Sequence, residues 1–196
     1  KECSTVKRTC TRPLCALLAL LLFLPSCGAG DKDSSVVTIT ACYEVPNTKE
    51  RLFTMYSDIV VVTVTKTKEK NNPRGDEYTS YQLLSTCKVE RVIRGNAQVG
   101  KSITISQMGN NRTLIYTDVK NNGDYLQEGQ RWMLILRKND ENPKDSYSIA
   151  NTVGQYALDE NDHITFMTDT SRSLLGDIQS VDDMEAIWQE YAAANP

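Results

Sequence analysis

Hydrophobic and polar residues alternate along much of the chain, and this alternation predicts β-strands. In Tyr78–Arg94, apolar residues such as Leu83 and Val89 alternate with polar ones, which is the period of a strand with one buried face. The segments Ile59–Thr65 and Arg131–Arg137 are apolar at nearly every position, which predicts strands buried on both faces. Further candidate strands are Val36–Tyr43, Ser102–Ser106, Tyr147–Ala150 and Ile164–Met167.

Two segments have helical signals instead. Thr48 is a good N-cap for a short helix that ends at Tyr56. Near the C-terminus, Ser180 and the acid three residues later form a capping-box pattern. The apolar positions that follow share one helical face: Val181, Met184, Ile187, Trp188 and Tyr191. We expect this helix to pack on the domain, because its acidic polar face disfavours the alternative of binding an anionic membrane surface.

The order of these elements predicts a mainly β domain. Several short strands followed by a terminal helix are typical of a small closed or partly open barrel. Polar stretches at Lys66–Asp76 and Gly109–Asp124 indicate a hairpin tip or loop and an exposed excursion. Residues 36–196 carry no second domain boundary and no internal repeat, so we expect one domain.

The N-terminal residues have the composition of a secretory signal peptide. A basic start precedes an apolar run at Leu14–Leu24, about half the ~20 residues that a spanning helix needs. The segment Leu24–Gly28 resembles the bacterial lipoprotein lipobox, with a Leu three residues before a Cys. The resemblance implies cleavage after residue 26 and a diacylglyceryl group, with palmitate among its acyl chains, on Cys27. The alternative is an ordinary secretory signal with an incidental cysteine.

The lipobox resemblance implies a lipid-anchored protein at the cell membrane or cell surface. Two acyl chains suffice for stable anchoring. The small and polar residues 27–35 then serve as a flexible tether, and the domain faces outside the cytoplasm.

The charge of the chain restricts its partners. The whole sequence has a net charge of −3, with 22 Lys and Arg against 25 Asp and Glu. Residues 1–26 hold four of the basic and one of the acidic residues, so the mature chain has 18 against 24, or −6. This balance argues against a nucleic-acid partner, which needs a basic surface.

Two cysteines, Cys42 and Cys87, remain in the mature domain after Cys27. Outside the cytoplasm they could form a disulfide, and the alternative is two buried thiols on separate strands.

Catalytic or metal-binding signatures are few. The single histidine, His163, follows an acidic turn and is expected at the solvent-exposed start of a strand. One histidine without paired cysteines does not make a typical zinc site, and no cofactor-binding motif is present. Asp159 and Asp162 are the carboxylates that a hydrolase would use, whereas solvated turn residues are the simpler interpretation.

Tyrosines near loops and strand ends are candidates for a recognition surface, because tyrosine combines a broad apolar ring with a polar tip. The candidates are Tyr78, Tyr81, Tyr116 and Tyr125. Packing in the core or at an edge is the alternative for each of them.

Four segments together resemble a known group of proteins: Ser57–Val61, Val89–Asn96, Val99–Ile105 and Glu128–Leu136. They are similar to the OB-like barrels of the netrin and metalloprotease-inhibitor (TIMP-like) group, in particular bacterial secreted proteins with this pattern. The resemblance implies an OB-like barrel preceded by a short helix. The animal inhibitors insert a free N-terminal cysteine amine into a protease metal site, whereas lipidation would block Cys27, so inhibition is not carried over.

These observations favour a non-enzymatic lipoprotein that binds an extracytoplasmic protein, peptide or glycan. The alternatives are a structural or assembly lipoprotein of the envelope and a carboxylate-dependent hydrolase.

Overall fold

The computed structural model describes residues 37–39, 45–74, 78–109, 114–116, 125–140, 146–150 and 153–196. All of them lie in one compact unit, Ser35–Pro196.

Five strands form a closed barrel: β2 (Asp58–Arg74), β3 (Tyr78–Arg94), β4 (Ser102–Met108), β6 (Arg131–Lys138) and β7 (Ser146–Ile149). Their order is β2-β3-β4-β7-β6, and antiparallel pairing of β6 with β2 closes the ring. The β4–β7 pair is parallel and the other barrel pairs are antiparallel. This Greek-key order is that of an OB-like barrel, so the predicted fold class is confirmed.

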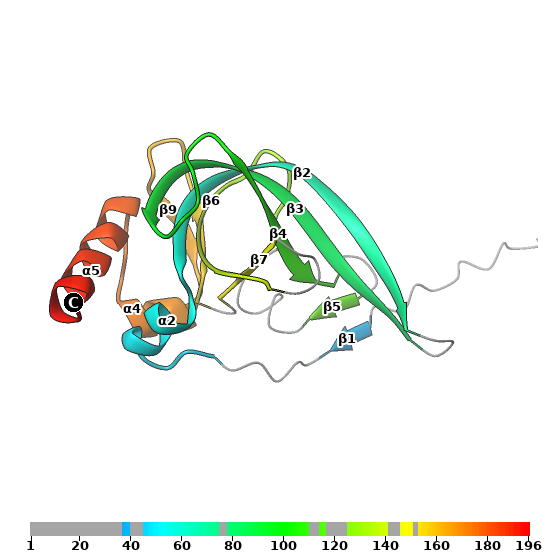
Figure 1. The fold of residues 1–196 in the computed structure, drawn as a ribbon, viewed down its shortest axis with the longest axis horizontal. Coiled ribbons are helices and arrows are strands. Elements are labelled where there is room, and N and C mark those ends of the chain that lie inside the picture. The colour runs from blue at the N-terminus through cyan, green and yellow to red at the C-terminus, as the bar shows by residue number, and fades with distance from the viewer. Residues whose placement is uncertain are drawn as a thin grey trace, which may run out of the picture. The chain divides into compact units, whose positions relative to one another are not determined.

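The remaining elements flank the barrel (Figure 1). They are α2 (Lys49–Met55), β8 (Gln155–Leu158), β9 (Ile164–Met167), α4 (Asp169–Leu175) and α5 (Val181–Ala194). Strands β8 and β9 extend the sheet beyond β6. Two short strands, β1 (Val37–Ile39) and β5 (Leu114–Tyr116), pair in parallel with each other.

Two hydrophobic cores lie on opposite sides of β2 and β6. The first fills the barrel and contains Val60, Val62 and Trp132. The second lies between the outer wall of these strands and the three helices, and it contains Ile59, Val61, Met133, Ile135, Leu52, Leu175 and Met184. Adjacent residues of one strand therefore enter different cores, which confirms that both strands are buried on both faces.

Both predicted helices form with the expected caps. The Thr48 hydroxyl accepts a hydrogen bond from the Arg51 N–H at 3.1 Å. The Ser180 hydroxyl and the Asp183 carboxylate complete a reciprocal capping box at the start of α5. Val181 and Met184 of α5 are fully buried in the second core, so the packing interpretation of this helix is confirmed.

Four features differ from the sequence prediction. Strand β5 lies within the stretch Gly109–Asp124 that was expected to be an exposed excursion. Strand β2 continues through most of the expected loop Lys66–Asp76 to Arg74, paired with β3 throughout. Strand β8 and helix α4 were not predicted. The polar end of β2 forms because β3 pairs with its backbone across the hairpin, and a pattern of hydrophobic residues does not reveal such pairing.

Candidate binding face

Three neighbouring strands present a row of lysines beside hydroxyl and apolar side chains, which we call the outer lysine face. It consists of Lys66, Lys68 and Lys70 on β2, Gln82, Leu84 and Thr86 on β3, and Thr104, Ser106 and Met108 on β4. Residues opposite each other in antiparallel strands point to the same side of the sheet. All nine side chains are exposed or half-buried, whereas Leu83, Ser85, Cys87, Ile105 and Gln107, which alternate with them on β3 and β4, are buried.

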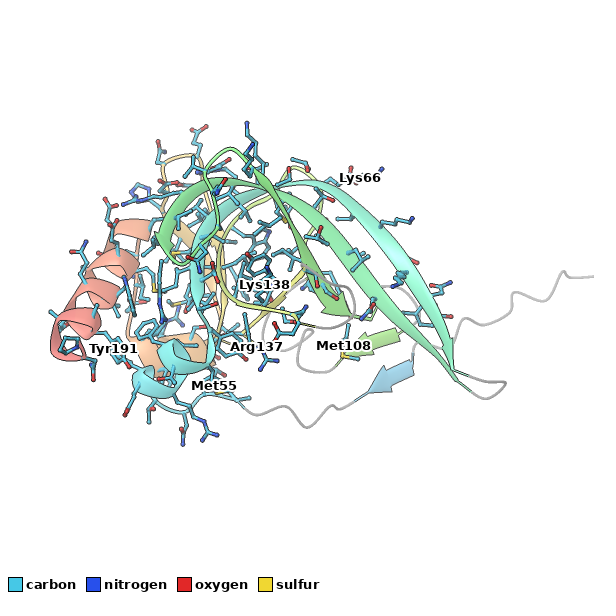
Figure 2. The ribbon with its side chains drawn as sticks, in the orientation of Figure 1. Met55, Lys66, Met108, Arg137, Lys138 and Tyr191 are labelled. Atoms are coloured by element: carbon cyan, nitrogen blue, oxygen red, sulfur yellow. The ribbon has the colours of Figure 1, made fainter. Side chains whose placement is uncertain are left out.

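A β-bulge separates this face from the barrel wall. The register of β2 against β3 shifts between Val64 and Lys66. Val64 still points into the barrel core, and Lys66 is already exposed. Figure 2 shows Lys66 on the long β2–β3 hairpin and Met108 at the end of β4.

The charge of the face is positive. Its nine residues include three lysines and no carboxylate, and within the described part of the chain no ion pair involves Lys66 or Lys68. Lys88 adds a further exposed positive charge next along β3. The face is therefore basic on an acidic protein.

The edge of β2 beside this face is partly covered. The Val64 N–H donates to the Gln130 carbonyl at 2.9 Å, and the Gly129 N–H donates to the Val64 carbonyl at 2.8 Å. Further along β2, the Glu128 carboxylate accepts from the Thr67 N–H at 2.8 Å. Pro73 has no N–H to offer near the end of the strand. These features disfavour the addition of another strand at this edge.

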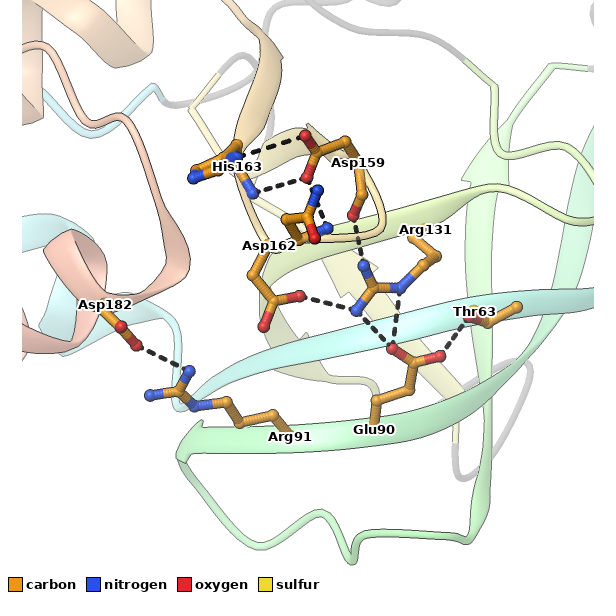
Figure 3. A network of polar contacts seen from close by, with 9 residues as sticks. Thr63, Glu90, Arg91, Arg131, Asp159, Asp162, His163 and Asp182 are labelled. Atoms are coloured by element: carbon orange, nitrogen blue, oxygen red, sulfur yellow. Dashed lines mark hydrogen bonds and ion pairs between the residues drawn. The ribbon is translucent and has the colours of Figure 1, made fainter.

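A second polar cluster surrounds Arg131 on β6 (Figure 3). Its guanidinium lies 2.8 Å from the Glu90 carboxylate and 2.7 Å from the Asp162 carboxylate, and it also donates to the Asp159 carbonyl. The Thr63 hydroxyl donates to the other oxygen of Glu90. Arg131 thus joins β3, β6 and the turn after β8.

The contacts of Glu90 lower the pKa of its carboxyl group. Partial burial would raise the pKa of Glu90, but hydrogen bonds from Thr63 and Arg131, with the charges of Arg131 and Lys88, outweigh burial and lower it.

The turn that precedes β9 is fixed by Asp159. One oxygen of its carboxylate accepts backbone N–H groups from Asn161 at 2.8 Å and His163 at 2.9 Å. The hydrogen bond from the His163 N–H is the main reason why the pKa of Asp159 is lowered. The His163 side chain is 66% exposed and its Nδ1 lies 3.4 Å from Asp159. Its exposure agrees with the sequence prediction.

Helix α5 is attached to β3 by two arginines. Arg91 pairs with Asp182 at 2.8 Å and also with Glu185. Arg94 donates to the carbonyls of Phe53 at 2.6 Å and Tyr56 at 3.0 Å, at the end of α2. Its guanidinium also lies 4.1 Å from the ring centroid of Trp188, a cation–π contact. These arginines act as structural links.

The predicted cysteine sites lie mostly outside the described residues, as Cys27 and Cys42 do. Cys87 is a buried, free thiol in this structure, and burial raises its pKa to about 12. Its Sγ lies 3.8 Å from the Ser85 carbonyl. Cys87 is therefore a buried thiol in this structure. A disulfide between Cys42 and Cys87 stays a prediction.

The tyrosines predicted to form a recognition surface do not behave alike. Tyr125 is only 2% exposed, and its hydroxyl donates to the Met108 carbonyl at 2.7 Å. Its predicted place on an exposed surface is therefore wrong, because its ring packs in the interior. Tyr81 is half-buried on β3. Tyr78 and Tyr116 lie in β3 and β5, and their side chains are outside the described part.

The chain matches no protein-family model and no curated protein. Among the described residues, no helix is long and apolar enough to cross a membrane. The same residues contain no group of three or more His, Cys, Asp and Glu side chains placed to hold a metal ion.

Sequence reasoning missed the outer lysine face. The signal was present in Lys66, Lys68 and Lys70, which alternate with Thr67 and Glu69. This period of two is a strand pattern, but a polar segment that follows a buried strand is also typical of a loop.

Proposed function

We propose that this chain is a non-enzymatic binding module, tethered to a membrane through lipid on Cys27, whose outer lysine face binds an extracytoplasmic ligand. The observation that carries the proposal is the position of that face. Helices α2, α4 and α5 pack against the outer wall of β2 and β6, whereas β3 and β4 present exposed and half-buried polar side chains. OB-like barrels offer the corresponding strands to their ligands.

The use of the ionisable groups supports binding rather than hydrolysis. Asp162 is paired with Arg131, and Asp159 accepts two backbone N–H groups. A hydrolytic carboxylate pair needs one member that keeps or takes a proton near neutral pH. The lowered pKa of Asp159 and its role in the turn fit a structural carboxylate.

The tether rests on the lipobox resemblance at Leu24–Gly28. Growth of the expressing bacteria with an alkyne-tagged fatty acid should label the wild-type protein. Cys27→Ser should abolish the label, and Cys10→Ser should keep it, because residue 10 lies upstream of the proposed cleavage site. A label that survives Cys27→Ser would contradict the tether.

Site-specific photo-crosslinking tests the binding face. A photoreactive residue at Ser106, on the outer lysine face, should capture a ligand in the native cells. The same residue at Glu190, exposed on α5, is the matched control. A product that forms equally from both positions, or from neither, would contradict binding at this face.

A further inference from the structure

We propose that the outer lysine face binds an extended acidic protein segment whose carboxylates occupy alternate positions. This inference rests on the proposed function, which makes the face the binding surface, and it specifies the class of ligand.

The spacing of the lysines supports an extended peptide. Lys66, Lys68 and Lys70 are alternate residues of one strand, so their Cα atoms repeat about every 6.8 Å. A peptide in the same extended conformation presents alternate side chains with the same repeat. Each acidic side chain of such a peptide can therefore face one lysine without distortion of either chain.

The width of the face suits one chain. Strands β2 and β4 both pair with β3. The lysines on β2 therefore lie about 10 Å from the outward residues of β4, twice the spacing of paired strands. A segment lying over Gln82, Leu84 and Thr86 would direct one set of side chains to the lysines. Its other set would reach the hydroxyls of Thr104 and Ser106.

Charge complementarity sets the sign of the ligand. Lys66 and Lys68 form no ion pair within the described residues. Two carboxylates on neighbouring segments have partners of their own: Glu128 accepts from the Thr67 N–H, and Glu90 is paired with Arg131. The face therefore has positive charge available for a partner.

A competing explanation is that the lysines protect the edge of β2 from pairing with another chain, a common use of edge lysines. That explanation predicts self-association when the lysines are neutralised. It does not predict affinity for an acidic peptide, and the two can be separated by experiment.

The probe is a fluorescent ten-residue peptide of alternating Glu and Thr, titrated with the full 196-residue chain in fluorescence anisotropy. Two comparison peptides are alternating Gln and Thr, and a block of five Glu followed by five Thr. The alternating acidic peptide should bind tightest, and its affinity should fall as salt is raised. Lys66→Gln with Lys68→Gln should weaken binding about tenfold. The control Lys49→Gln with Lys101→Gln removes two exposed lysines elsewhere and should leave it unchanged.

Equal binding of the acidic block peptide, or of inorganic polyphosphate, would overturn the inference in favour of a general polyanion surface. Equal loss in both double variants would overturn it too. Self-association of the Lys66/Lys68 variant with unchanged peptide affinity would establish edge protection instead. If no peptide binds but the photoreactive residue at Ser106 still captures a partner, the ligand class is wrong and the proposed function stands. If neither peptide binding nor capture is observed, the ligand class and the proposed function are both wrong.

Discussion

Gly95 shows how a single residue connects two distant parts of the chain. It follows β3 with a φ of +106°, and a Cβ built on it would lie 2.1 Å from an Asp58 carboxylate oxygen. Asp58 is 3% exposed, and it accepts from the Asn96 N–H at 2.9 Å and the Ser57 hydroxyl at 2.6 Å. The turn after β3 is thus built around the carboxylate that begins β2.

Gly95→Ala should lower the free energy of unfolding by about 3 kcal/mol, because left-handed strain and the clash with Asp58 act together. Gly100→Ala is the control, since Gly100 has a φ of +80° but nothing within 4 Å of an added Cβ. It should lose only about 1 kcal/mol. Urea unfolding measures both, and equal losses would show that the contact with Asp58 does not matter.

Substitution of a buried hydroxyl on β3 should not lower the stability of the protein, in contrast to Gly95→Ala. Ser85 is fully buried, and its Oγ has no hydrogen-bond partner among the described residues. Ser85→Ala should therefore leave stability within about 0.5 kcal/mol of wild type or raise it, because an unpaired polar group is removed. Tyr156→Phe is the comparison: the Tyr156 hydroxyl donates to the Val153 carbonyl at 2.8 Å, and its removal should cost about 1 kcal/mol. A larger loss for Ser85→Ala would contradict this account.

At the scale of elements, α5 closes the second core, and its start depends on a cap. The Ser180 hydroxyl accepts from the Asp183 N–H at 3.2 Å, and the Asp183 carboxylate accepts from the Ser180 N–H at 3.0 Å. Ser180→Ala should cost about 1 kcal/mol in thermal or urea unfolding. Glu190→Ala, exposed on the same helix, should stay within about 0.5 kcal/mol. Equal effects of the two changes would argue against the cap.

The elements also show what could be predicted from sequence. The two-sided strands around Ile59 and Met133, and the capped helix α5, formed as predicted because their signals are local and strong. The end of β2 at Arg74 was missed because its stability comes from pairing with β3, and β8 because its four residues carry little periodicity. The lysine face depends on that pairing, so it could not be located before the register was known.

At the scale of the whole molecule, strand β2 lies in two environments: helices cover the outer face of its first part, and the outer face of its second part is exposed to solvent. The outward residues Ile59 and Val61 of β2 meet the helices, and after the bulge the same strand presents Lys66 and Lys68 to solvent. The bulge at Val64 therefore marks the boundary between the part of β2 that packs in the cores and the part that carries the proposed binding residues. This arrangement allows the lysines to be changed with little effect on the cores, which is why they suit the binding test.

The Arg131 cluster joins β3, β6 and the turn before β9, and it should make stability depend on pH. The pKa of Glu90 is lowered in the folded state, so its contribution is present above its unfolded pKa of about 4.3 and is lost as pH falls through the folded value. Glu90 is one-third exposed, at 33%, and solvent screening keeps this contribution to about 1 kcal/mol or less. Urea unfolding between pH 7 and pH 3 should therefore show a shallower loss of stability for Glu90→Gln than for wild type. Glu190→Gln, a control without an ion pair among the described residues, should keep the wild-type slope, and a Glu90→Gln slope equal to wild type would show that this cluster does not link folding to protonation.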